Sequence, residues 1–273
     1  MSDYVDLGSG TPVVLVPAIQ GRWEFARPAV EALARLGRVL TFSLRGEPGT
    51  GVYDEGLGLE NYATQIDEVL DRSGLKHAVI VGVSAGGRIA LRYAATRPER
   101  VRGLVLVSAV PPAWSLRRMH EFYARHPTVS AVLFLAGSPR RLTAEILRAC
   151  GGWLRGLRFG LWYLITGFTS RPVPTRMARL ARLMAAIDQT PDCAGVQAPT
   201  LLVTGEPDLD KVIPTVDTAA YLHLIPGARL VVLPRTGHIG LSTRPEAFAA
   251  LIHDFIAHDV VAAEARRGVQ EVA

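Results

Sequence analysis

The sequence contains only two cysteines, Cys150 and Cys193, and they lie far apart in the chain. This number and spacing exclude a disulfide-rich framework and do not match the closely spaced ligands of a metal site. Such cysteine usage is typical of a reducing compartment, so we expect the cytoplasm. No apolar run is longer than a strand, which argues against a transmembrane helix. Residues 1–6 also lack the basic and apolar regions of a secretory signal.

Acidic residues are scarce in one segment of the chain. Between Arg140 and Arg182 there are nine arginines and a single acid, Glu145. Such a segment can attract an anionic ligand or surface, and a solvated arginine-rich face is the simpler interpretation. No base-reading motif accompanies the arginines, so nucleic acid is not an expected partner. Docking on a membrane surface is not expected either, since it requires that the helices of this segment expose apolar faces.

The sequence is rich in short apolar runs, and hydrophobic residues make up 49% of its 273 residues, enough for a sizeable core. Runs of strand length are separated by segments whose apolar residues recur with helical spacing. This alternation predicts an α/β fold, with a mostly parallel central sheet and helices on both faces. The predicted strands are residues 13–16, 39–44, 79–83, 104–108, 200–204 and 229–233. The predicted helices around them are residues 24–36, 59–73, 87–96, 216–223 and 245–258.

The alternation breaks in the middle of the chain. From residue 111 to residue 195 no strand is predicted, and the apolar spacing indicates helices instead. An all-helical insertion between two halves of one sheet indicates a lid over the carboxyl edge of that sheet. We therefore expect a core (1–110 and 196–260), a helical cap or lid (111–195) and a frayed polar tail (261–273). The predicted cap helices are residues 115–125, 129–136, 143–149, 153–166 and 175–187.

The most informative feature is a serine between an apolar strand and a helix, in Gly82-Val83-Ser84-Ala85-Gly86. Glycines at 82 and 86 leave room for a tight turn, because a Cβ at either position would collide with the neighbouring element. The turn raises the hydroxyl above the sheet and sets it at the N-terminus of the next helix. Backbone N–H groups and the positive helix end favour a developing negative charge there. Ser84 is therefore predicted to be a nucleophile.

A serine hydroxyl needs a neighbouring base, and that base needs an acid to orient it. Of the seven histidines, only His238 lies in a loop directly after a late strand, beside Gly237. This loop belongs to the carboxyl edge of the sheet, the same edge as Ser84. The acid is expected in the loop after strand 200–204, which contains Glu206, Asp208 and Asp210.

With these residues in the order Ser, Asp, His, the chain resembles the α/β-hydrolase fold superfamily over nearly its whole length. Relatives often carry the acid four residues before a proline, which selects Asp210 ahead of Pro214. Other relatives carry it three residues after the glycine that ends the strand, which selects Asp208. We favour Asp210 and keep Asp208 as the alternative. The resemblance implies a serine hydrolase that needs neither a cofactor nor a metal.

The resemblance also implies an oxyanion hole made by the backbone N–H groups of Ile19 and Ala85. Many relatives have His-Gly where this sequence has Pro17-Ala18. Alanine resists backbone angles that glycine adopts, so this departure points to a slow enzyme or an unusual substrate. The side chain of Gln20 is an alternative donor.

The predicted reaction is hydrolysis of a small apolar carboxylic ester or lactone through an acyl-enzyme intermediate. The same residues support two other reactions in relatives, carbon–carbon bond hydrolysis of a diketone and cofactor-free perhydrolysis. A low-turnover ligand-binding or sensory protein is the alternative from another class, suggested by the altered oxyanion segment. The sequence does not predict the oligomeric state. Aromatic residues in the cap favour an apolar substrate, among them Trp114, Phe122, Trp153, Trp162 and Phe168.

Overall fold

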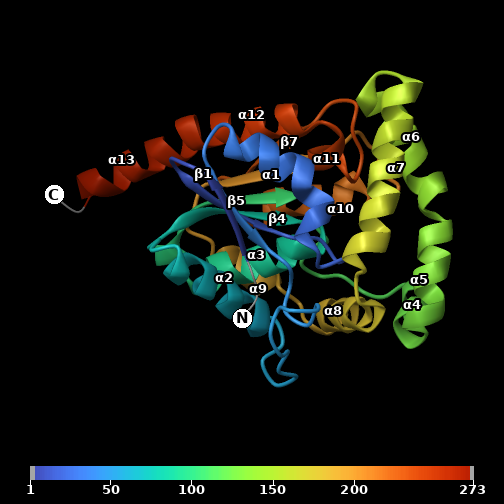
Figure 1. Ribbon diagram of the computed structural model, residues 1–273. Helices are drawn as coiled ribbons and strands as arrows, with labels where there is room; N and C mark the ends of the chain where they lie inside the picture. The colour runs from blue at the N-terminus through green and yellow to red at the C-terminus, as the bar shows by residue number, and fades with distance from the viewer. Residues whose placement is uncertain (1–3, 271–273) are drawn as a thin grey trace.

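The computed structural model describes residues 4–270, apart from the side chains of 134, 135 and 267–270. Seven strands form one sheet in the order β1-β3-β2-β4-β5-β6-β7. All neighbouring strands run parallel except β1, which pairs antiparallel with β3. The predicted α/β fold is therefore confirmed (Figure 1). The strands are β1 (Tyr4–Gly8), β2 (Pro12–Val16), β3 (Arg38–Phe42), β4 (Ala78–Val83), β5 (Val101–Val107), β6 (Thr200–Thr204) and β7 (Arg229–Val232).

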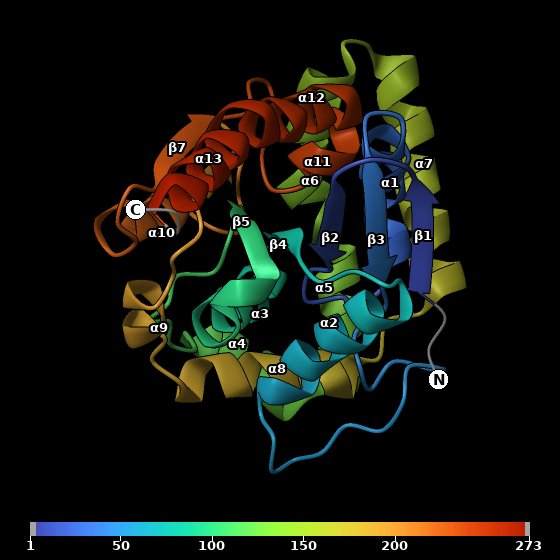
Figure 2. The ribbon, with the colours of Figure 1, turned by 90° about the vertical axis from the view of Figure 1, so that its left-hand side faces the viewer.

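Helices cover both faces of this sheet. The core helices are η1 (Trp23–Ala26), α1 (Arg27–Ala34), α2 (Glu60–Arg72), α3 (Ala85–Thr96), η2 (Pro98–Arg100), α10 (Thr215–Ala219), η3 (Ala220–His223), α11 (Gly240–Thr243) and α12 (Pro245–Phe255). Successive side chains of a strand point to opposite faces, so Val14 and Ile80 pack toward α2 and α3, while Val13 and Val81 pack toward α1 and α12. Figure 2 shows α12 on one side of the sheet and α2 and α3 on the other. Both faces of the central strands are buried and apolar, as expected for a parallel sheet covered by helices on both sides.

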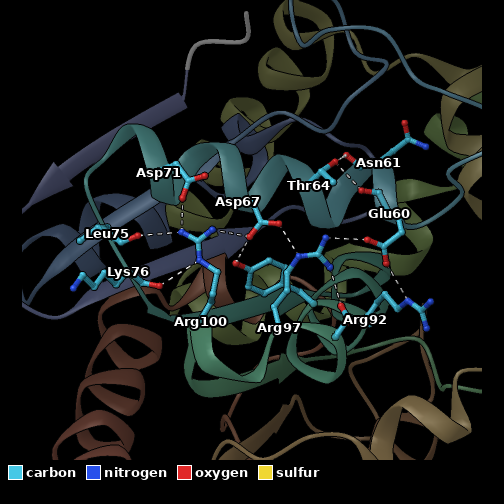
Figure 3. Close-up of polar contacts among 12 residues, drawn as sticks. Glu60, Asn61, Thr64, Asp67, Asp71, Leu75, Lys76, Arg92, Arg97 and Arg100 are labelled. Carbon is cyan, nitrogen blue, oxygen red and sulfur yellow. Dashed lines mark hydrogen bonds and ion pairs between the residues drawn. The ribbon is translucent and has the colours of Figure 1, made fainter.

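Hydrogen bonds and ion pairs join α2 to α3 and η2. Asp67 on α2 accepts hydrogen bonds from the Tyr93 hydroxyl at 2.9 Å and from Arg97 Nε at 2.6 Å (Figure 3). Arg100 donates to the same carboxylate at 2.9 Å, and Arg97 also reaches Glu60 at 3.0 Å. An isolated pair of this exposure contributes little, whereas a network that shares one carboxylate restrains several groups together. The network secures α3, the helix that follows the serine turn.

The chain between β5 and β6 is helical throughout its described secondary structure. Its helices are α4 (Arg118–Arg125), α5 (Pro127–Ala136), α6 (Ser138–Cys150), α7 (Trp153–Ser170), α8 (Pro174–Ala186) and α9 (Thr190–Ala194). Five of them match predicted cap helices, α6 begins earlier than expected, and α9 was not predicted. Figure 1 shows α4 to α7 along one side of the molecule. None of the described helices combines the length and the apolar character needed to cross a membrane.

The secondary structure at the two ends of the chain differs from that predicted from the sequence. Strand β1 was not predicted, and it adds to the edge of the sheet beside β3. The expected frayed tail is wrong for the described residues, because a π-helical turn (Ile256–Val260) continues into α13 (Val261–Gln270). Val260 is buried, and Glu264 forms an ion pair with Arg102 of β5 at 2.8 Å. These two contacts hold the start of α13 against the sheet. Residues 271–273 lie outside the described part of the chain.

Candidate active site

The turn that carries Ser84 has a strained backbone. Ser84 has a φ of 53°, in the left-handed region that favours glycine. A Cβ on Gly82 would lie 2.5 Å from the carbonyl oxygen of Gly86, and one on Gly86 would lie 2.4 Å from that of Pro17. The predicted need for both glycines is therefore confirmed. The turn sets the Ser84 hydroxyl between the carboxyl end of β4 and the first turn of α3.

The side chains of Ser84, His238 and Asp210 form a chain of hydrogen-bonding contacts. His238 Nε2 lies 3.2 Å from Ser84 Oγ, and His238 Nδ1 lies 3.2 Å from Asp210 Oδ2. Ser84 follows β4, His238 follows β7 and Asp210 follows β6. The three side chains meet at the carboxyl edge of the sheet. Ser84 and His238 are 154 residues apart in the sequence, so the fold brings together groups that local structure alone would not.

The loop after β6 positions Asp210 through its own backbone. Asp210 Oδ1 accepts hydrogen bonds from the N–H groups of Val212 and Ile213 at 3.0 and 2.9 Å, which leaves Oδ2 for His238. Burial acts to raise the pKa of Asp210, but hydrogen bonds from His238 and from these N–H groups outweigh it and hold the pKa below its ordinary value. Asp208 is exposed and has no hydrogen bond to His238 within the described structure. The geometry favours Asp210 over Asp208.

The two predicted oxyanion donors belong to two different turns, the turn after β2 and the serine turn. Ile19 is in the turn after β2, which is closed by a hydrogen bond from the Gly21 N–H to the Ala18 carbonyl at 2.8 Å. Ala85 is the first residue of α3. Neither the Ile19 nor the Ala85 N–H donates to a backbone carbonyl in the described residues, so both are free for a ligand. Gln20 is half-buried, and within the same residues its side chain forms no hydrogen bond.

The turn of Ile19 is held by an arginine of α8. Arg176 donates hydrogen bonds to the Ile19 carbonyl and to the Glu47 carboxylate. The side chains of this ion pair are 1% and 0% exposed, so the expected solvated arginine face is wrong for Arg176. Glu47 also accepts from the Val173 N–H at 3.2 Å, and a Cβ on Gly21 would lie 2.5 Å from Arg176 Cζ. The helical insertion thus contacts the oxyanion segment through a buried charge.

The loop of His238 is held by a carboxyl group from α6. The side chain of Glu145 is fully buried, and its Oε1 and Oε2 accept the Ile239 N–H at 3.1 and 3.2 Å. The hydroxyl of Thr243 lies 3.4 Å from Oε1. A Cβ on Gly237 would lie 2.4 Å from the backbone carbonyl oxygen of Leu209, so glycine is needed beside the histidine. Burial raises the pKa of Glu145 to about 7, against the opposing effect of the N–H groups of Gly237 and Ile239.

The sequence pattern does not predict these roles for Glu145 and Arg176. One signal for Glu145 was available, since it is the single acid among nine arginines. It also lies at helical spacing from the apolar Leu142 and Ala149 on the buried face of α6. Arg176 has no comparable signal, because nothing in its local sequence separates it from its arginine neighbours.

The cap aromatics do not all contribute to one pocket. Trp153 and Phe168 are 68% and 60% exposed, so most of the surface of each ring faces solvent. Tyr163 packs edge-on against Phe25 of η1, with ring centroids 5.3 Å apart. The aromatic residues therefore serve partly to attach α7 to the core.

Comparison with known proteins identifies the family. A family model described as the alpha/beta hydrolase family matches residues 13–251. The chain belongs to the alpha/beta hydrolase family. This α/β hydrolase is 28% identical over 264 residues to the 2-hydroxy-6-oxo-2,4-heptadienoate hydrolase of Pseudomonas putida, covering 92% of this chain and 91% of that protein.

Other relatives carry different hydrolase names. The α/β hydrolase is 26% identical over 255 residues to the poly(3-hydroxyalkanoate) depolymerase of Ectopseudomonas oleovorans, covering 90% of this chain and 84% of that protein. Among solved structures, the enol-lactonase from Burkholderia xenovorans LB400 has a TM-score of 0.78 and 22% identity, covering 94% of this chain and 96% of that one. The predicted assignment as an enzyme of this fold is confirmed.

Proposed function

We propose that this α/β hydrolase cleaves small apolar carboxylic esters or lactones through an acyl-enzyme intermediate. The observation that carries the proposal is the position of the His238 ring, 3.2 Å from both Ser84 Oγ and Asp210 Oδ2. Ser84 Oγ attacks the substrate carbonyl carbon while His238 Nε2 takes its proton. Asp210 fixes the tautomer of His238 and stabilises the imidazolium. The N–H groups of Ile19 and Ala85 stabilise the oxyanion of the tetrahedral intermediate.

Collapse of this intermediate breaks the bond between the carbonyl carbon and the leaving oxygen. His238 gives its proton to that oxygen, and the acyl group remains on Ser84. A water molecule then attacks the acyl carbon and gives a proton to His238. The second collapse returns that proton to Ser84 and releases the carboxylic acid. Every bond change is accounted for by these groups and water, so the proposed reaction requires no cofactor.

We also propose that the helical insertion, residues 111–195, acts as a lid over the carboxyl edge of the sheet. Two contacts support this role. Arg176 of α8 reaches the carbonyl of Ile19, and Glu145 of α6 reaches the N–H of Ile239. A movement of the insertion would therefore displace both the oxyanion segment and the histidine loop.

Support for an ester or lactone comes from the names of similar proteins. The depolymerase relative is named for a polymer whose units are joined by esters, and the structural neighbour is named an enol-lactonase. A chain-length series of p-nitrophenyl esters tests the proposal, beside a Ser84→Ala variant. We expect turnover with short acyl chains and loss of at least about 10³-fold in kcat for the variant. Ester hydrolysis that survives Ser84→Ala would contradict the nucleophile assignment.

Carbon–carbon bond hydrolysis is the second candidate, because the Pseudomonas putida relative is named for a 2-hydroxy-6-oxo-dienoate substrate. In that reaction the group expelled from the carbonyl carbon is a carbanion that must be protonated. The discriminating measurement offers a 6-oxo-dienoate and a p-nitrophenyl ester to the same preparation. Turnover of every ester below about one per minute, with rapid loss of the dienoate, would favour this candidate.

A further inference from the structure

One face of α7 is apolar and exposed over the whole length of the helix. Its large apolar residues recur every three or four positions, which places them on one side of an α-helix. Each of them is between 44% and 61% exposed, and Trp153 at the start of the helix is 68% exposed. The residues of this exposed α7 face are Leu154, Leu157, Leu161, Leu164, Ile165 and Phe168.

The opposite side of α7 attaches the helix to the rest of the molecule. Tyr163 packs on Phe25, and Gly156 is buried beside Leu147 of α6. The exposed face is therefore not the side through which α7 is held, and substitutions on it leave these contacts in place. Figure 1 shows α7 beside α6 at one side of the molecule, away from α13. A soluble protein rarely leaves a continuous apolar stripe of this length uncovered unless it binds something.

The charged residues of α7 itself all have the same sign. Helix α7 contains no acid, and its basic residues Arg155 and Arg158 are exposed. Arg140 on α6 and Arg171 after α7 are exposed as well. None of these four arginines forms an ion pair within the described residues. The only acid between Arg140 and Arg182 is Glu145, which is buried and turned toward Ile239.

A groove beside α7 extends this positive region. It has a volume of about 750 Å³, and Arg155 and Arg158 line it together with Arg27 and Arg244. Two carboxylates also line it, and one of them, Glu246, is paired with Arg35 at 3.1 Å. The groove therefore offers several arginines to an anionic group next to an apolar stripe.

We propose that the exposed α7 face docks on a membrane surface that contains anionic lipid. A helix with an apolar stripe and flanking arginines lies in the interface between headgroups and acyl chains, with its cations toward the anionic headgroups. A second copy of this chain fits less well, because two such faces would bring arginines together with no acid on α7 to pair with them. Membrane docking requires exposed apolar helix faces, and α7 has such a face. The proposal is independent of the hydrolase mechanism, since binding is measured without turnover.

The test is co-sedimentation of the full chain with phosphatidylcholine vesicles, with and without phosphatidylglycerol. We expect binding to the anionic vesicles at low salt, weaker binding at high salt, and little binding to phosphatidylcholine alone. A double substitution, Leu157→Asp with Leu161→Asp, is expected to lower the partition coefficient by about tenfold or more. The matched control is Val52→Asp with Val216→Asp, which adds the same charge at residues 90% and 71% exposed elsewhere. This control is expected to retain binding within about threefold.

Tryptophan fluorescence gives a second readout on the unmodified chain. Insertion of Trp153 into the interface shifts its emission to shorter wavelength, and the shift should be absent from a Trp153→Phe variant. Equal losses in the α7 variant and the control, or no binding to anionic vesicles at low salt, would overturn the proposal. So would light scattering that shows a dimer which Leu157→Asp with Leu161→Asp converts to a monomer, because a second copy would then cover the face.

Discussion

Glu145 accepts hydrogen bonds from the backbone N–H of Ile239, the residue directly after His238, at 3.1 and 3.2 Å. The two residues are 94 positions apart and belong to the helical insertion and to the loop after β7. A buried carboxyl group therefore connects the insertion to the loop that presents the imidazole. Burial raises the pKa of the Glu145 carboxyl group to about 7, so this group gains or loses its charge near neutral pH.

Replacing Glu145 by glutamine is expected to change how stability depends on pH. Burial raises the pKa of Glu145 in the folded chain, so the folded state holds a proton that the unfolded state has lost. The resulting stabilisation is complete below the ordinary value of 4.5 and is lost as the pH rises to about 7. The loss amounts to about 3 kcal/mol. Melting temperatures between about pH 5 and pH 8 should fall more for the wild type than for Glu145→Gln. Parallel curves would show that the group does not titrate in this range.

Replacing Arg176 by methionine is expected to reduce both stability and catalysis. The change leaves the buried Glu47 without its cation, which costs about 3–5 kcal/mol. It also removes the guanidinium that holds the Ile19 carbonyl, so kcat should fall by about tenfold or more while KM changes little.

A double variant separates these two effects. Glu47→Gln with Arg176→Met removes both charges and should recover part of the stability measured by denaturant unfolding. Its kcat should stay low, because the Ile19 carbonyl is still without its donor. Recovery of kcat together with stability would mean that Arg176 acts on folding alone.

Asp210→Asn and Asp208→Asn form a matched pair that assigns the acid. Asparagine at 210 can no longer hold the imidazolium of His238, so kcat should fall by about 10³–10⁴-fold. Asp208 is exposed on the same loop, and its replacement should change kcat by less than about twofold. The reverse ranking of the two variants would assign the role to Asp208.

Two glycine substitutions are expected to have opposite effects on stability. A Cβ at Gly86 would lie 2.4 Å from the Pro17 carbonyl oxygen and 2.6 Å from that of Val16, so Gly86→Ala should destabilise the fold severely. A Cβ at Gly160 within α7 meets nothing within 4 Å, so Gly160→Ala should stabilise the chain by about 0.5–1 kcal/mol. Urea unfolding of the two variants checks both signs, and a stable, active Gly86→Ala would contradict the packing described for the serine turn.

The parts of the site that could be predicted are those encoded by local pattern. Ser84, Asp210 and His238 each follow an apolar strand, and parallel strands end at one edge, so their convergence follows from the fold. The glycines at 82 and 86 belong to the same local pattern, because the turn excludes a Cβ.

The contacts of Glu145 and Arg176 could not be predicted in the same way. They join the insertion to loops that lie 94 and 157 residues away, and no local periodicity encodes such a pairing. The secondary structure at the ends of the chain was predicted wrongly for a related reason. Strand β1 is short and contains the polar Asp6, and its place is set by pairing with β3. Helix α13 is held by an ion pair to β5 that the sequence pattern does not reveal.

Ser84 is proposed to be an activated nucleophile, and covalent labelling can test this without any knowledge of the substrate. A fluorophosphonate reacts with an activated serine hydroxyl, and peptide mass spectrometry then locates the adduct. We expect one labelled peptide, with the adduct on Ser84, and loss of labelling in both Ser84→Ala and His238→Ala. An unlabelled wild-type chain, or an adduct on another residue that persists in Ser84→Ala, would contradict it.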